Sequence, residues 1–425
     1  MKRPRLFRGS ALSAALVAAL LSGTDATRGA AWAQEAQPAP MGLSEVIRLA
    51  ASQRQELSAA HARVRASVER PAVVSALEDP MISASIDHKP FNMRGMDYSF
   101  AIEQRIPLGS LRQDRRQSAE ADIARLRAEA EDKQLGVAAE AASAFLMLQQ
   151  RRRTAELLHQ RREIARAIVA AADARYGGGT GEQADVLRAE VEVARVEAQL
   201  KASTGRVAAA EAMLNASLGQ EVDRPVRPLR PPVLDRPTPT WAEVEARLPS
   251  LPRLQAGRAE IGRSEAEVRV MRDMYKPMAT VRAGPAYDMD NKWGAMLMVG
   301  VSVPIWRSKL SAGVREAEAM REMSRADLRA MTRMVEGEAA QALNELKAAG
   351  ELQRSLRAEI GPRARFAIDP TLAAYAAGRQ PLVSVLEALQ TLWSVENELI
   401  DADMQVGLAW VRLGRATGSY ELITL

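Results

Sequence analysis

The strongest constraint on this chain is an internal repeat, because one unit recurs at an offset of 197 to 199 residues. The early landmarks recur 197 residues later. Pro80-Met81-Ile82 recurs as Pro277-Met278-Ala279, and Ile106-Pro107-Leu108 recurs as Val303-Pro304-Ile305. A later landmark, Tyr176-Gly177-Gly178-Gly179, recurs 199 residues later as Tyr375-Ala376-Ala377-Gly378. Two residues are therefore added between these landmarks in the second copy, and the fold must use the same elements twice.

The repeat and the local composition predict four regions. These are a signal peptide (1–33), a first structural repeat (34–220), a connector (221–240) and a second structural repeat (241–425). The connector holds six prolines and no periodic pattern, which is typical of an extended linker. The first region has a basic start, an apolar run from Ala11 to Leu21 and the ending Ala31-Trp32-Ala33, so cleavage before Gln34 and export are expected.

Charge and cysteine content exclude some functions. The formal charge of +5 falls to about +1 once the basic leader is removed, which leaves no field to attract nucleic acid. The chain has no cysteine, so disulfides, thiolate metal sites and a lipid-anchoring cysteine are all excluded. We therefore expect an exported protein that is not lipidated.

Each half shows the same order of periodicities: helix, two alternating segments, a very long helix, a tight turn and a closing helix. Opening helices are expected over 43–76, with a kink at Pro71, and over 241–275. The stretch from 110 to 176 lacks proline and predicts a helix of roughly 100 Å at 1.5 Å rise per residue. Its counterpart, from Leu310 onward, meets Gly361-Pro362 and Pro370, so a break followed by a short helix is expected there.

The closing helices carry a heptad pattern. One seam contains Val186, Val193, Leu200, Val207 and Leu214, alternating with Ala189, Val196, Ser203 and Ala210. The other contains Val385, Leu392, Leu399, Val406 and Leu413, alternating with Ala388, Val395, Ala402 and Ala409. Corresponding positions differ by 199, and the small residues allow close approach of neighbouring helices, so coiled-coil packing is predicted in both halves. An ordinary bundle core explains one such seam but not its duplication.

Four segments alternate with a period of two, which predicts a β-hairpin in each half. They are 81–89, 96–106, 278–289 and 293–303, with turn-like connectors at 90–92 and 290–292. About ten residues is the length of a barrel strand that crosses a membrane. Because four strands cannot close a barrel, several chains must contribute to one barrel, and three chains would supply twelve strands. The alternative is a four-stranded sheet packed on helices in a soluble protein.

The chain resembles the TolC-type outer-membrane efflux family over nearly all its mature length. Besides the duplicated plan, the matching stretches are Gln104 to Gly109, Tyr176 to Leu187, Leu214 to Gly219 and Tyr375 to Leu386. The fold class this implies is mainly α with a small β part: duplicated long-helix hairpins and four strands per chain, forming a trimeric α-barrel and β-barrel channel. The resemblance also implies a homotrimer in the outer membrane of a Gram-negative bacterium that extends into the periplasm. It would work with a periplasmic adaptor protein and an inner-membrane pump in a tripartite efflux system or a type I secretion system.

Transport would be passive, and no cofactor is expected. The glycines from Gly177 to Gly181 do not form a phosphate-binding loop, because no Gly-Lys-Ser/Thr follows and a helix precedes them. The resemblance makes them a helix-to-helix turn at the periplasmic tip. Adaptor-docking candidates at the two tips are Gly178, Gly181, Gly378 and Gln380, and gate candidates are Asp185, Glu387, Tyr375 and Arg379. A solvated helix end is the plainer interpretation of the same residues.

Cargo is the least constrained feature. The polar faces of the alternating segments give the lumen-facing candidates Glu103, Arg105, Met296 and Met298. Eighteen methionines suggest soft metals, since thioethers suit Cu(I) or Ag(I), although flexible helix packing also explains them. They favour the heavy-metal efflux branch slightly over drug efflux. No hydrolase motif is present, so an enzyme is not expected, and a periplasmic coiled-coil scaffold or adaptor without a channel is the alternative function.

Overall fold

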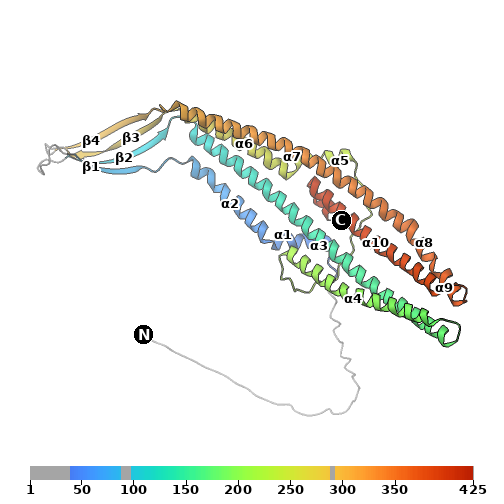
Figure 1. Ribbon diagram of the computed structural model, residues 1–425. Coiled ribbons are helices and arrows are strands. Elements are labelled where there is room, and N and C mark those ends of the chain that lie inside the picture. The colour runs from blue at the N-terminus through green and yellow to red at the C-terminus, as the bar shows by residue number, and fades with distance from the viewer. Residues whose placement is uncertain (1–38, 88–96, 288–291, 425) are drawn as a thin grey trace, which may run out of the picture. The chain divides into compact units, whose positions relative to one another are not determined.

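The computed structural model describes residues 39–87, 97–287 and 292–424. The predicted signal peptide lies outside these residues, as do the connector at 90–92 and most of that at 290–292. Within them the chain is mainly helical with one four-stranded sheet, which confirms the expected fold class (Figure 1). No helix in these ranges combines the length and the apolar character needed to cross a bilayer.

The first half contains α1 (Leu43–Gln53), α2 (Gln55–Ser75), β1 (Met81–Asp87), β2 (Asp97–Pro107), α3 (Leu111–Gly177) and α4 (Gln183–Leu218). The second half contains α5 (Trp241–Glu245), the 3-10 turn η1 (Leu248–Ser250), α6 (Pro252–Asp273), β3 (Met278–Tyr287), β4 (Trp293–Ser302), α7 (Arg307–Ser355), the π turn η2 (Leu356–Ile360), α8 (Gly361–Phe366), α9 (Ile368–Ala376), α10 (Leu382–Thr417) and α11 (Tyr420–Ile423). The two halves therefore repeat one element order.

The long helices follow the proline pattern. Helix α3 runs unbroken through 67 residues, as its proline-free sequence predicts. Its counterpart ends at Ser355 and continues through the π turn, α8 and α9. The two residues added in the second copy fall between the strands and the turn that joins α9 to α10. A π turn is one way in which a helix accommodates an insertion.

The opening helices differ from the expectation of continuous helices over 43–76 and 241–275. The first breaks at Arg54, which has ψ of 116°, and α2 then runs through Pro71. The second breaks at Leu251, which has ψ of 132° and lies 197 residues after Arg54. Proline explains the second break, because Pro252 disfavours helical geometry at Leu251. Tertiary contacts explain the first: Arg54 donates hydrogen bonds to the Ser217 carbonyl at 3.2 Å and to the Glu140 carboxylate at 3.0 Å.

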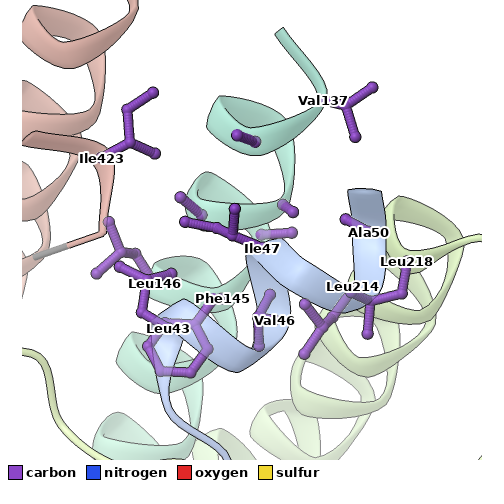
Figure 2. Close-up of a cluster of buried hydrophobic side chains, with 14 of the residues drawn as sticks. Leu43, Val46, Ile47, Ala50, Val137, Phe145, Leu146, Leu214, Leu218 and Ile423 are labelled. Carbon is purple, nitrogen blue, oxygen red and sulfur yellow. The ribbon is translucent and has the colours of Figure 1, made fainter. Parts of the chain in front are cut away.

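Helix α1 packs across α3 and α4 in one hydrophobic core (Figure 2). Leu43, Val46, Ile47 and Ala50 of α1 contact buried side chains of α3 and α4 in this core. A second core joins the α5–α6 region to α7 and α10 in the same way. In the α4 seam all four smaller positions are buried, namely Ala189, Val196, Ser203 and Ala210, whereas of the larger positions Leu214 alone is buried. Small residues there let α4 approach α3 closely.

The sheet is antiparallel with strand order β1-β2-β3-β4. Pairs such as Ile82↔Ile102, Ile102↔Ala283 and Ala283↔Leu297 place one row of apolar side chains on a single face. No described helix covers either face of this sheet (Figure 1). The alternative of a sheet packed on helices is therefore wrong.

Candidate functional site at the paired helix turns

Two helix turns, α3–α4 and α9–α10, lie at the end of the helices that is remote from the sheet (Figure 1). Each begins with a glycine in the left-handed region, Gly179 at φ 73° and Gly378 at φ 69°, 199 residues apart. The amide of each glycine donates to the carbonyl three residues earlier, and the next amide donates to the carbonyl five residues earlier. This is the Schellman ending, in which glycine avoids the strain that a Cβ would add.

Two of the four gate candidates come together between these turns. Tyr375 of α9 is 4% exposed, and its hydroxyl is buried without a hydrogen-bond partner in the described part of the chain. Burial raises the pKa of Tyr375 above its usual value, and the nearby Asp185 carboxylate raises it further, while Arg175 acts in the opposite direction. Asp185 of α4 is 9% exposed, and its Oδ1 accepts a hydrogen bond from Arg188 at 3.3 Å.

A residue that the sequence did not single out, Arg175, joins the two turns. Its guanidinium donates to the Tyr375 carbonyl at 2.6 Å and to the Thr180 carbonyl at 3.1 Å. The guanidinium carbon also lies 4.4 Å from the centre of the Tyr375 ring, which is a cation–π distance. A basic residue in the last turn of a helix is common for electrostatic reasons, so the sequence gives no signal of this contact.

The remaining candidates lie elsewhere. Arg379 and Glu387 are exposed, and neither side chain has an ion pair with any residue in the described ranges. Among the tip residues, Gly178 closes α3 with φ of −81° and Gln380 is exposed. Gly179 lies within the predicted glycine turn but was not among the docking candidates, and it is the glycine of this turn that has a positive φ.

The four lumen-facing candidates share one face of the sheet. Register pairs align Met298 with Arg282 and Arg282 with Glu103, and they align Met296 with Gly284. On this face Arg105 lies 3.8 Å from Glu103, and Arg282 donates to the Ser83 hydroxyl at 2.9 Å. The alternation seen in the sequence thus separates a polar face from an apolar one.

The family model described as "Outer membrane efflux protein" matches the chain twice, at residues 46–220 and 245–419. The chain belongs to the outer membrane efflux protein family. The family places it in the outer membrane, extending into the periplasm, and identifies it as an efflux channel protein rather than an enzyme. The alternative of a periplasmic scaffold without a channel is therefore wrong.

Individual relatives agree with this family. The cobalt-zinc-cadmium resistance protein CzcC of Cupriavidus metallidurans is 26% identical over 60% of this chain, and the match spans 61% of that relative. The outer membrane efflux protein BepC of Brucella suis biovar 1 is 25% identical over 94% of this chain and 89% of its own length. The solved structure of the outer-membrane channel OprN has the same fold, with a TM-score of 0.78 at 18% identity over 89% of this chain and 90% of OprN.

Proposed function

We propose that three copies of this chain form the passive exit duct of a tripartite efflux system, together with a periplasmic adaptor protein and an inner-membrane pump. The observation that carries this proposal is the sheet, whose apolar face is exposed in the single chain. Phe100, Ile102 and Leu297 on the apolar face are 56%, 56% and 73% exposed, more than Met298 at 44% and Ala101 at 2% on the polar face. This is the reverse of the pattern in a water-soluble sheet and suits contact with lipid.

The edges of the sheet support assembly between copies. Among the described strands, β1 and β4 each pair with a single neighbour. Unpaired backbone groups at a sheet edge are not tolerated in lipid, where no water can satisfy them. Pairing β4 of one copy with β1 of the next satisfies both edges, and three copies then close a barrel of twelve strands. Glu103, Arg105, Met296 and Met298 would line its interior.

The paired helix turns would form the periplasmic end of this duct. Tyr375 and Asp185 would hold the aperture within each chain, while the exposed Arg379 and Glu387 are available for bonds between chains. The tips around Gly178, Gly181, Gly378 and Gln380 would dock the adaptor. These roles rest on the family resemblance together with the contact between the two turns.

We also propose the division of the chain into a signal peptide (1–33), two structural repeats (34–220 and 241–425) and a connector (221–240). The duplicated left-handed glycines support the repeats.

Heavy-metal cargo is the second element of the proposal, since CzcC is named for cobalt, zinc and cadmium resistance. The cargo proposal is tested by measuring, with inductively coupled plasma, the metal retained by cells that have the chain and by cells that lack it.

A lysine placed on each face of β4 tests the duct. Leu297→Lys puts a charge on the lipid-facing side at a cost on the order of 1–4 kcal/mol, depending on its depth. Met296→Lys is the matched control, because the neighbouring residue points to the opposite, polar face. We expect Leu297→Lys to remove most of the trimer from the outer-membrane fraction and Met296→Lys to leave it. Equal yields of trimer from both variants would contradict the proposed lipid face.

A further inference from the structure

Helix α7 carries four exposed methionines in two Met-x-x-Met pairs. Met320 and Met323 are 50% and 49% exposed, and Met331 and Met334 are 37% and 62% exposed. At 100° per residue, all four fall within a sector of roughly 80° on the helix. We call these four residues the methionine stripe.

The methionine stripe is not the packing face of α7. The buried residues of this helix are Ala317, Ser324, Val335, Ala339, Ala342, Leu343 and Leu346. In the same projection these residues occupy a separate sector, adjacent to that of the stripe. Flexible filling of the core of the single chain therefore does not explain why methionine occupies the stripe.

The charges on the same sector favour a cation. Between Gly313 and Leu352 the sector bears the acidic residues Glu316, Asp327, Glu338 and Glu345 and no lysine or arginine. The basic residues of this part of α7 all project elsewhere: Arg315, Arg321, Arg325, Arg329, Arg333 and Lys347. Glu338 and Glu345 form ion pairs with Arg253 and Arg412, whereas Glu316 and Asp327 have no ion pair with any described residue.

Two hollows flank the stripe along the same side of α7. Lys309, in the stripe's sector, lines a cavity of about 340 Å³ at the junction of helices and strands, together with Met274 and Met278. Glu338, Gln341 and Glu345 line a cavity of about 1000 Å³ near the helix breaks, together with Met147 and Met213. Methionines thus line both hollows, beside basic side chains that include Arg253 and Arg412 in the larger hollow and Lys276 in the smaller one.

We propose that each Met-x-x-Met pair of the methionine stripe binds one soft monovalent metal ion, Cu(I) or Ag(I). Residues three apart on a helix have Cβ atoms about 5–6 Å apart, which lets two thioether sulfurs reach one ion. Thioethers select soft ions over divalent ions that prefer nitrogen and oxygen ligands. The unpaired Glu316 and Asp327 carboxylates concentrate cations near the stripe. A role of this site in cargo transfer rests on the proposed duct, but binding itself does not.

Silver titration of the full-length protein in chloride-free detergent solution tests the proposal. Ag(I) is the probe because it does not need protection from oxidation as Cu(I) does, and native mass spectrometry counts the bound ions. We expect Met320→Leu with Met323→Leu to remove one ion per chain, Met331→Leu with Met334→Leu to remove another, and all four together to remove two. Leucine conserves volume, so the fold should be kept.

Controls separate the thioethers from other effects. Met41→Leu with Met404→Leu changes two methionines outside the sector and should leave silver binding unchanged. Unchanged Ag(I) stoichiometry in the fourfold variant, or an equal loss of Zn(II) binding there, would overturn the proposal. Conductance of the same preparations in planar bilayers is the independent measure of the duct. Conductance without silver binding counts against the methionine site alone, and silver binding without conductance supports the site while counting against the duct.

Discussion

The guanidinium of Arg175 lies 4.4 Å from the centre of the Tyr375 ring and donates a hydrogen bond to the Tyr375 carbonyl at 2.6 Å. The two residues are 200 positions apart in the chain and come from opposite halves of the repeat. The position 199 residues after Arg175 is Ala374, so the repeat does not duplicate this contact. One asymmetric side chain therefore bridges two otherwise similar helix turns, beside a hydrophobic cluster to which α3, α4, α9 and α10 all contribute.

Removing Arg175 should loosen the paired turns. Arg175→Ala deletes two hydrogen bonds and a cation–π contact, each worth about 0.5–1.5 kcal/mol, so local opening should become easier by about 1.5–4.5 kcal/mol. Hydrogen exchange of the amides of residues 374–380 measures this opening directly. Arg379→Ala, which removes an exposed arginine from the same turn, is the control and should change exchange little. Equal protection in both variants would show that Arg175 does not join the turns.

Replacing Tyr375 by phenylalanine removes a buried hydroxyl that has no partner in the described residues. An unsatisfied buried hydroxyl costs about 1–3 kcal/mol, so we expect Tyr375→Phe to raise the thermal midpoint of the purified protein at neutral pH. A lower midpoint would mean that the hydroxyl has an acceptor in the assembled protein.

The same variant should change the response to alkaline pH. Burial, with Asp185, raises the pKa of Tyr375 in the fold above its unfolded value of about 10. The stability that this group contributes is therefore present below pH 10 and lost as pH rises through the folded pKa. Thermal midpoints measured from about pH 8 to about pH 11.5 should fall less steeply for Tyr375→Phe than for the original chain. Tyr176→Phe, at the equivalent but exposed position, should keep the original slope.

Local signals in the sequence predicted the elements that depend on local chemistry. Pro362 and Pro370 mark the interrupted helix, and the absence of proline marks α3. Alternation predicted the strands because the two faces of the sheet meet different surroundings. By contrast, the break at Arg54 depends on a carbonyl 163 residues away, and the position of Arg175 depends on a turn 200 residues away. Contacts of this kind leave no periodicity, so a single sequence does not reveal them.

The left-handed glycines give a further prediction. Alanine at φ near 70° costs about 1–2 kcal/mol, so Gly179→Ala and Gly378→Ala should each lower the thermal midpoint. Gly177, the last residue of α3, has helical geometry and open space where a Cβ would project. Gly177→Ala should therefore be neutral or raise stability by up to about 1 kcal/mol. Equal destabilisation by all three substitutions would contradict the assignment of the strain to φ.

The last prediction concerns Asp403, a buried carboxylate beside the π turn. It accepts hydrogen bonds from Arg153 of α3 at 2.9 Å, from Gln353 of α7 at 2.7 Å and from Arg357 of η2 at 2.8 Å. One side chain of α10 thus ties together three elements at the place where the second long helix changes its winding. Removing the Asp403 carboxylate should therefore destabilise mainly the region of the π turn.

Asp403→Leu leaves three donors without their acceptor, and the two arginines are half-exposed, so part of the loss is recovered by water. We expect a cost of about 2–3 kcal/mol, with faster hydrogen exchange concentrated at residues 353–366. Asp401→Asn is the control, because Asp401 accepts a hydrogen bond from Gln150 and the substitution keeps an acceptor oxygen. If exchange rises uniformly along α7 rather than near the π turn, Asp403 stabilises the bundle generally and does not anchor the change in winding.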